Sequence, residues 1–463
     1  MSGDAPSGLF DRPVLAIDPG FHTAPITRAD VDAADRIAVT GSEDRTVRVW
    51  SLADGSLKRT IRLPQGPGNI SKVYVVALSP DGELIAVGGW TRWSENDRQQ
   101  QIYIFSAING MMRQRIDGLL NVANDLAFSP DGERLAAAVG TSLRLYERDA
   151  AERWAEVVTD DRYGDISLRV AFNTDGSFAT TSRDGKVRLY DAHGGRIKSV
   201  PILNARPAGL GFNPVDGRLA VGFADRAAVL LMDGRTLAPL APPDIAAIHN
   251  RFNKPLANVA WSDDGATLFA AGQYEDDQGR RVIAWSDSAR GSPWTLPAAH
   301  NTISGLRPLP GRALLVAAAD PWLGVLEADG TPRWTEPPRQ IDPRHQDHCL
   351  MASPDGMLVE FGLGIGGVDR RRFDLRALHL LPQIEDDRVL PPRQDGLMVS
   401  GWKDKCAPRL NGTRLPLDTD EVSRSLAVNS DGDQFLLGTE WWLRAFDRSG
   451  AVLWPPRPVP GAA

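Results

Sequence analysis

The sequence has few of the features that mark exported, disulfide-bonded or membrane-embedded proteins. Its 463 residues include two cysteines, Cys349 and Cys406, which are too few for a disulfide scaffold and indicate two free thiols. The N-terminal segment has no basic region followed by an apolar run, so no secretory signal is predicted. No apolar stretch reaches the length that crosses a bilayer. We therefore expect a cytoplasmic protein without a membrane partner.

An excess of basic residues is also missing. The chain holds 52 Lys and Arg residues against 59 Asp and Glu residues, which gives a net charge of −7 and an isoelectric point near 5.6. A general nucleic-acid-binding protein is expected to be basic, so no nucleic-acid partner is predicted. Hydrophobic residues, at 42%, are numerous enough to fill a sizeable core.

What the sequence does contain is a repeated hairpin pattern. "VALSPDGELIAVGG" (76–89) returns as "LAFSPDGERLAAAVG" (126–140) and as "VAFNTDGSFATTS" (170–182). Pro80 and Asp81 suit the corners of a type I turn, and Gly82 supplies the positive φ that leads into the next strand. The run before the turn is apolar on both faces, so its strand is expected to lie between two neighbouring sheets.

The hairpin recurs at a spacing of roughly 45 residues, with four short strands in each of about ten units, which predicts an all-β fold of propeller blades. The turn glycines that mark the units are Gly82, Gly132, Gly176, Gly217, Gly265, Gly311, Gly356, Gly396 and Gly432.

The first unit, "GFHTAPITRADVDAADRIAVTGSEDRTVRVWS" (20–51), resembles a WD40 repeat. It has the Gly-His pair, the small-residue strand, the turn aspartate and the closing tryptophan of that pattern. The resemblance implies a structural hydrogen-bonded tetrad of His22, Ser42 (or Thr40), Asp44 and Trp50. Later units mostly lack the His, and we expect them to depend on apolar packing between blades.

About ten blades exceed the four to eight that usually close one ring. We therefore predict a seven-bladed WD40-like β-propeller in residues 1–338 and a partial second propeller of about three blades in residues 339–463. The segment at 335–347 is rich in Pro and charge, which suits a boundary. The strand expected in "RPVLAIDPGFH" (12–22) would latch the first ring. Three blades cannot close a ring, so we expect a fragment or a chain that another chain completes.

The loops between second and third strands, and those between blades, are expected on one rim. Irregular insertions at 90–101, 159–165, 242–255 and 273–281 fall in these two classes. Rigid scaffolds often display binding residues on such loops, and aromatic and Arg side chains favour interfaces. The predicted partner-binding residues are Trp90, Arg92, Trp93, Tyr163, Arg251, Phe252, Tyr274 and Asp276.

Candidate catalytic motifs are weak. The group "DPRHQDHC" (342–349) is interpreted as a connector, because neighbouring residues on a strand point to opposite faces, and "GLGIGG" (362–367) opens no helix that would hold a phosphate. The strands that face the axis offer mainly Val, Ala and Leu. "LEADGTPRW" (326–334) and "FDRSGAVLW" (446–454) resemble quinoprotein propellers, although both also fit ordinary hairpins. The alternative function is therefore a quinone- or metal-dependent propeller enzyme.

Three stretches, 66–90, 284–291 and 435–447, are similar to the WD40 region of bacterial proteins that carry a caspase-like peptidase. This resemblance implies a sensor or scaffold that controls a separate effector. We therefore predict a non-catalytic scaffold that binds proteins, possesses no cofactor or metal, and has a protein partner such as a caspase-like peptidase.

Overall fold

The computed structural model divides into two compact units, Met1–Pro338 and Arg339–Ala463. The structure describes residues 18–63, 70–91, 99–245, 254–276, 279–337, 350–353, 357–361, 371–377, 379–381, 397–402, 407–418, 421–429, 431–439 and 442–458.

Antiparallel strands dominate the described chain, which confirms the predicted all-β fold. Its helices are the single turn α1 (Ser286–Ala289) and the 3-10 turn η2 (Pro310–Arg312). No helix in these described ranges is long and apolar enough to cross a membrane.

In its described residues the first unit contains seven antiparallel sheets, which we call blades 1 to 7 in chain order. The strands of the first four blades are β1 (Ile26–Val31), β2 (Ile37–Ser42), β3 (Thr46–Ser51) and β4 (Leu57–Arg62); β5 (Val73–Leu78), β6 (Leu84–Gly89), β7 (Gln100–Ser106) and β8 (Met112–Leu119); β9 (Ala123–Phe128), β10 (Arg134–Val139), β11 (Ser142–Arg148) and β12 (Trp154–Asp160); and β13 (Ser167–Phe172), β14 (Phe178–Ser182), β15 (Lys186–Tyr190) and β16 (Arg196–Pro201).

Blades 5 to 7 vary this plan. Among the described residues, blade 5 has three strands and blade 6 has five. The fifth strand of blade 6 comes from the insertion before β23, which forms a short extra strand. Their strands are β17 (Pro207–Phe212), β18 (Leu219–Phe223) and β19 (Val229–Met232); β20 (Asn258–Trp261), β21 (Leu268–Ala271), β22 (Glu275–Asp276), β23 (Gly279–Trp285) and β24 (Pro293–Ala299); and β25 (Ile303–Leu309), β26 (Ala313–Ala318), β27 (Leu323–Leu326) and β28 (Pro332–Glu336).

The repeated turn forms the hairpin that its residues predict. Gly82 adopts a φ of 75°, and its N–H donates to the Ser79 carbonyl at 2.8 Å. The Ser79 hydroxyl accepts from Leu84 N–H at 2.9 Å. These bonds fix the turn between β5 and β6 and set their register, with Leu78 opposite Ile85.

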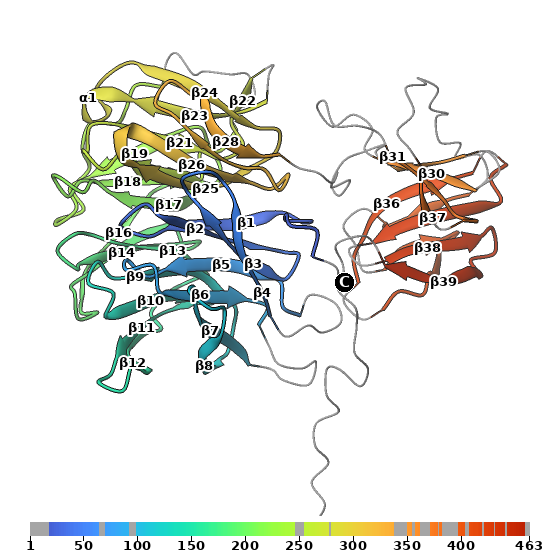
Figure 1. The fold of residues 1–463 in the computed structure, drawn as a ribbon, viewed down its shortest axis with the longest axis horizontal. Helices are drawn as coiled ribbons and strands as arrows, with labels where there is room; N and C mark the ends of the chain where they lie inside the picture. Colours follow the sequence, from blue (N-terminus) through green and yellow to red (C-terminus); the bar gives the residue numbers. More distant parts are fainter. Residues whose placement is uncertain are drawn as a thin grey trace, which may run out of the picture. The chain divides into compact units, whose positions relative to one another are not determined.

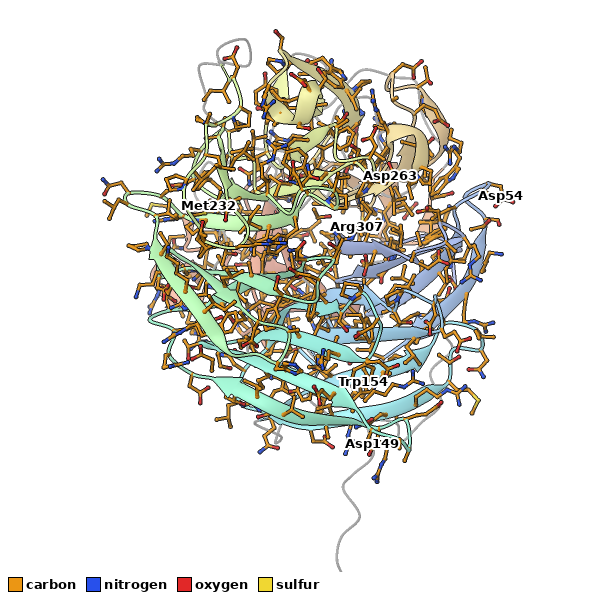
Figure 2. The ribbon with its side chains drawn as sticks, turned by 90° about the vertical axis from the view of Figure 1, so that its left-hand side faces the viewer. Asp54, Asp149, Trp154, Met232, Asp263 and Arg307 are labelled. Atoms are coloured by element: carbon orange, nitrogen blue, oxygen red, sulfur yellow. The ribbon has the colours of Figure 1, made fainter. Side chains whose placement is uncertain are left out.

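The blades form a closed ring. The innermost strands β1, β5, β9, β13, β17, β20 and β25 each contact the next, and β25 contacts β1. In Figure 1, β25 and β26 of blade 7 lie beside β1 of blade 1. Figure 2 shows this unit end-on, with Arg307 toward its centre and Asp54 and Asp149 at its edge.

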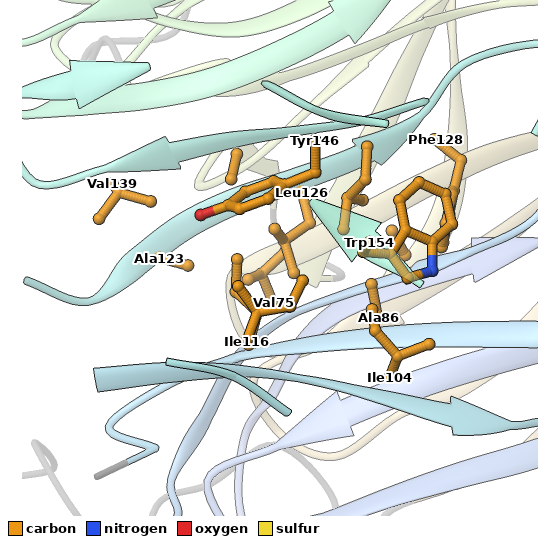
Figure 3. Close-up of a cluster of buried hydrophobic side chains, with 14 of the residues drawn as sticks. Val75, Ala86, Ile104, Ile116, Ala123, Leu126, Phe128, Val139, Tyr146 and Trp154 are labelled. Atoms are coloured by element: carbon orange, nitrogen blue, oxygen red, sulfur yellow. The ribbon is translucent and has the colours of Figure 1, made fainter. Parts of the chain in front are cut away.

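Apolar side chains fill the space between neighbouring blades. Figure 3 shows the cluster between blades 2 and 3, where Val75 and Ile104 meet Leu126, Tyr146 and Trp154. The neighbouring residues of β5, Val73 and Val76, belong to a second cluster that they form with blade 1. The inner strand is therefore covered on both faces, which explains its continuous apolar run.

The junction of blades 1 and 7 uses the same packing with added hydrogen bonds. Ile26, Trp50 and Leu52 of blade 1 share a buried cluster with residues of blade 7 such as Leu315. Trp334 Nε1–H donates to the Leu52 carbonyl at 2.8 Å. Residues 12–17 of the expected latch lie outside the described residues, and blade 7 already has four strands from residues 303–336.

The second unit contains three sheets in its described residues, which we call blades 8 to 10. They consist of β29 (Leu350–Ala352), β30 (Leu358–Phe361), β31 (Arg371–Asp374) and β32 (His379–Leu380); β33 (Val399–Ser400), β34 (Arg409–Leu410) and β35 (Thr413–Arg414); and β36 (Ser423–Val428), β37 (Gln434–Thr439), β38 (Trp442–Asp447) and β39 (Val452–Pro458).

Blade 10 is the centre of this second unit. Along β37, Phe435 and Leu437 pack on Leu410 of blade 9, whereas Leu436 between them packs with Val359 of blade 8. Because successive strand residues point to opposite faces, blade 10 lies between blades 8 and 9, although it follows both in the sequence.

Candidate functional site

A buried hydrogen-bond network closes blade 1. Trp50 Nε1–H donates to Thr40 Oγ1 at 2.8 Å, and Thr40 Oγ1 lies 2.6 Å from His22 Nε2. His22 Nδ1 lies 2.8 Å from Asp44 Oδ2 and donates to it, because a carboxylate can only accept. Burial alone would raise the pKa of Asp44, but its interactions with His22 and the Thr46 hydroxyl outweigh burial and lower it.

The prediction that Ser42 supplies the hydroxyl of this network is wrong. Ser42 Oγ instead donates to the Ala24 carbonyl at 2.9 Å and accepts from Asp44 N–H at 3.1 Å. Thr40, which the sequence left as the alternative, occupies the position between His22 and Trp50.

Blade 4 contains a parallel network with a tyrosine in place of the histidine. Tyr163 OH lies 2.7 Å from Thr180 Oγ1 and 2.9 Å from Tyr190 OH. Asp184 Oδ2 accepts from Gly164 N–H at 3.0 Å, as Asp44 accepts from Thr23 N–H. Burial alone would raise the pKa of Asp184, but hydrogen bonds from Arg188 and Ser182 lower it to about 2.

The residues predicted to form the partner-binding rim differ in how exposed they are. Tyr163 and Tyr274 are each 7% exposed, which corrects the expectation that they face a partner, and Tyr274 packs in the apolar cluster between blades 5 and 6. Trp90 is half-buried, and its Nε1–H donates to Tyr74 OH at 2.5 Å. Asp276 is more open and pairs with Arg281 at 2.6 Å.

The other predicted residues lie outside the described residues. These are Arg92, Trp93, Arg251 and Phe252, together with the connector at 342–349 and the glycine-rich stretch at 362–367. Within the described residues, no group of three or more His, Cys, Asp or Glu side chains is arranged to hold a metal ion. The two quinoprotein-like stretches form the hairpins β27–β28 and β38–β39.

A cavity of about 470 Å³ lies on the axis of the first ring. All seven inner strands line it, and it extends to turn residues such as Ala33, Pro80 and Asp263. It therefore opens on the rim of the first-to-second-strand turns, which is opposite the rim expected for the long insertions. Its volume falls within the range of about 300–1,000 Å³ that is usual for ligand pockets.

Val, Ala and Leu together are the largest group of residues in the cavity wall, as expected for the axial strands, but charged side chains that were not predicted there lie among them. Arg28 of blade 1 reaches across to Asp125 of blade 3, with Nε 3.2 Å from Oδ1 and side chains 11% and 10% exposed. The other Asp125 oxygen accepts from Val170 N–H of blade 4 at 3.0 Å. Burial lowers the pKa of Arg28 and raises that of Asp125, and their mutual attraction opposes both shifts.

A second ion pair links blade 7 to blade 1. Arg307 Nε donates to Asp30 Oδ1 at 2.7 Å, and Asp30 Oδ2 accepts from Leu78 N–H of blade 2 at 2.8 Å. Burial alone would lower the pKa of Arg307, but the attraction of Asp30 outweighs burial and raises it. Each aspartate thus ties its own blade to two others around the axis, Asp30 to blades 7 and 2 and Asp125 to blades 1 and 4.

Comparison with known proteins connects the two networks. Residues 20–51 and 164–191 match the family model for the WD domain, G-beta repeat. These segments hold the His22–Asp44 network and most of the Tyr163–Asp184 network. The chain contains WD40 repeats.

The WD40 relatives match part of the chain. The small ribosomal subunit protein RACK1y of Oryza sativa subsp. japonica is 30% identical over 167 residues, which are 34% of this chain and 44% of that protein. The small ribosomal subunit protein RACK1 of Caenorhabditis elegans is 30% identical over 113 residues, 24% of this chain and 30% of that protein. The aligned segments thus span less than half of either relative.

The second WD40 match begins at Gly164, directly after Tyr163. Tyr163 thus lies just outside the match, but its contact with Thr180 parallels the contact of His22 with Thr40. The spacing of Asp184 and Tyr190, equal to that of Asp44 and Trp50, is the sequence signal that blade 4 keeps this pattern.

Proposed function

We propose that the chain is a non-catalytic scaffold that binds other proteins through its first ring. The strongest support is that the buried polar side chains with catalytic potential serve as structural hydrogen-bond partners. His22 and Asp44 in blade 1, and Tyr163 and Asp184 in blade 4, form hydrogen bonds within their own blades. Function on such a rigid frame is then expected from loops, turns and the axial cavity rather than from these buried groups.

The relatives support a binding role. Both are named as proteins of the small ribosomal subunit, which is an assembly of many components. For this chain we propose a protein partner in the cytoplasm, and the resemblance to peptidase-linked WD40 regions suggests an effector such as a caspase-like peptidase. The proposed rim contacts remain Trp90, Arg92, Trp93, Arg251, Phe252 and Asp276.

The test is affinity purification of the tagged full chain, followed by mass spectrometry and by titration with each purified candidate partner. We expect at least one protein to bind the chain directly and in a fixed ratio. The Trp93→Ala/Phe252→Ala variant is expected to bind it more weakly, while Val215→Ala, at an exposed first-to-second-strand turn, serves as the control on the opposite rim.

The alternative, a quinone- or metal-dependent enzyme, is tested on the same preparation. Elemental analysis and the visible absorption spectrum report bound metal and quinone. A chain that binds no protein but contains stoichiometric Ca²⁺, Zn²⁺ or a quinone chromophore would contradict the scaffold proposal.

A further inference from the structure

One arginine of the axial cavity differs from the other two. Arg28 and Arg307 each pair with an aspartate. Arg169 follows the bulge of β13 as Arg28 follows the bulge of β1, so the two occupy equivalent positions in blades 4 and 1. Its guanidinium Nη1 donates to the carbonyl of the preceding residue, Leu168, at 3.3 Å.

Within the described residues, Arg169 therefore has no carboxylate partner, although it is half-buried and lines the cavity. A guanidinium withdrawn from water is strongly stabilised when a carboxylate or phosphate accepts its paired N–H groups. The cavity thus offers a place for a negatively charged group beside Arg169.

The mouth of the same cavity has the opposite charge. Asp35 in the turn of blade 1 and Asp263 in the turn of blade 6 both line it. Burial raises the pKa of Asp35, and the nearby charges of Asp32 and Asp263 raise it further. Blade 7, which lies between these blades, has a short turn in which Leu309 already pairs with Ala313. The negative charges of Asp35 and Asp263 therefore repel each other across the turn of blade 7.

An arginine inside the cavity and two aspartates at its mouth favour an anionic group that carries a basic group beside it over a free anion. A free anion that approaches the cavity is repelled by Asp35 and Asp263 before it reaches Arg169. A segment with a basic residue next to its carboxylate is instead attracted at the mouth, while its carboxylate reaches the arginine. Complementary charge of both signs in one cavity favours such a dipolar ligand.

We propose that the axial cavity binds an extended segment of a protein partner, with a carboxylate at Arg169 and a basic side chain between Asp35 and Asp263. This inference rests on the proposed scaffold function and names the class of partner segment. The carboxylate is supplied either by a Glu or Asp side chain or by the C-terminus of the partner.

The experiment uses the full chain and a positional library of fluorescent hexapeptides. One arm has amidated C-termini with Glu or Gln at each position, and the other has free C-termini without acidic side chains. Binding is followed by fluorescence polarisation. We expect selection of peptides that place a Lys or Arg next to the carboxylate, and the arm that supplies them identifies the source of the carboxylate.

The Arg169→Gln variant is expected to weaken binding of the selected peptides by roughly tenfold or more, since hydrogen bonds to charged groups are among the stronger ones. Arg169→Lys, which keeps the charge but not the planar fork, is expected to retain part of the affinity. Arg183→Gln, at an exposed turn on the opposite rim of blade 4, is the matched control and should bind as the unaltered chain does.

The inference is overturned if the library shows no preference for a carboxylate, or if R169Q and R183Q bind the selected peptides equally. It is also overturned if inorganic phosphate displaces the peptides at their own concentration, which would indicate a small-anion site. If R169Q folds and captures the same proteins as the unaltered chain, the cavity inference fails while the scaffold function stands. Failure of the unaltered chain to bind any protein contradicts the scaffold function itself.

Discussion

Replacing Thr40 by Val tests the network that closes blade 1. Thr40 is fully buried, and its hydroxyl meets both His22 and Trp50. Valine keeps the shape but removes the hydroxyl. Two hydrogen bonds of about 1 kcal/mol each are lost, and the Trp50 N–H is left buried without an acceptor at a further cost of about 1–3 kcal/mol. We expect the free energy of unfolding to fall by ~3–5 kcal/mol.

Urea unfolding and hydrogen exchange of the β1–β4 amides measure this loss. Trp50→Phe removes the donor but keeps a ring, so neither the lost bond nor the unsatisfied N–H counts there, and the cost of Thr40→Val should be about 2–4 kcal/mol smaller in the Trp50→Phe background. Ser42→Ala, which breaks other bonds of the same strand, should be additive with Trp50→Phe. The reasoning is refuted if Thr40→Val is additive with Trp50→Phe, or if it changes stability by less than about 0.5 kcal/mol.

Three further changes test the other polar groups. Because the folded pKa of Asp184 is lowered to about 2, its stabilisation is present above its ordinary pKa and is lost as the pH falls toward 2, so Asp184→Asn should reduce the acid sensitivity of the thermal midpoint. Asp125→Ala leaves Arg28 buried without its partner and should cost about 3–5 kcal/mol in urea unfolding. Tyr163→Phe should lower the free energy of unfolding by roughly 1–3 kcal/mol without changing the capture of partner proteins. If the folded variant captures less partner, Tyr163 is a partner contact after all.

The repeating turns allowed the propeller fold to be predicted from the sequence. Ser79, Pro80, Asp81 and Gly82 specify a hairpin through local chemistry, and that chemistry recurs at the blade period. Apolar residues on both faces of β5 required a sheet on each side, and the structure places one there.

The choice between Thr40 and Ser42 depends on information that local patterns do not contain. Both side chains point to the same face of β2, since they are two residues apart. The register of β2 and β3 places Trp50 opposite Ala38, so the diagonal neighbour within reach of its indole is Thr40. Register depends on the whole sheet rather than on the two hydroxyl residues.

Burial of the loop aromatics and the charge of the cavity were missed for a different reason. Tyr163 and Tyr274 lie in connecting segments, and their burial depends on whether those segments fold back over their own blades. Arg28, Asp125 and Arg169 each lie in a short strand of mixed polar and apolar residues, where nothing in the local pattern marks them as facing an axis. They form a charged wall because closure of the ring brings distant strands to one axis.

The junction between blades 1 and 7 has a mechanical consequence. Its contacts are the buried cluster around Trp50 and bonds such as that from Trp334 to Leu52, and each of the seven sheets is built from one continuous stretch of chain. When the first unit is stretched between optical traps attached near its ends, the junction bears the load first. Blades should then detach whole, each releasing roughly 45 residues in one extension step.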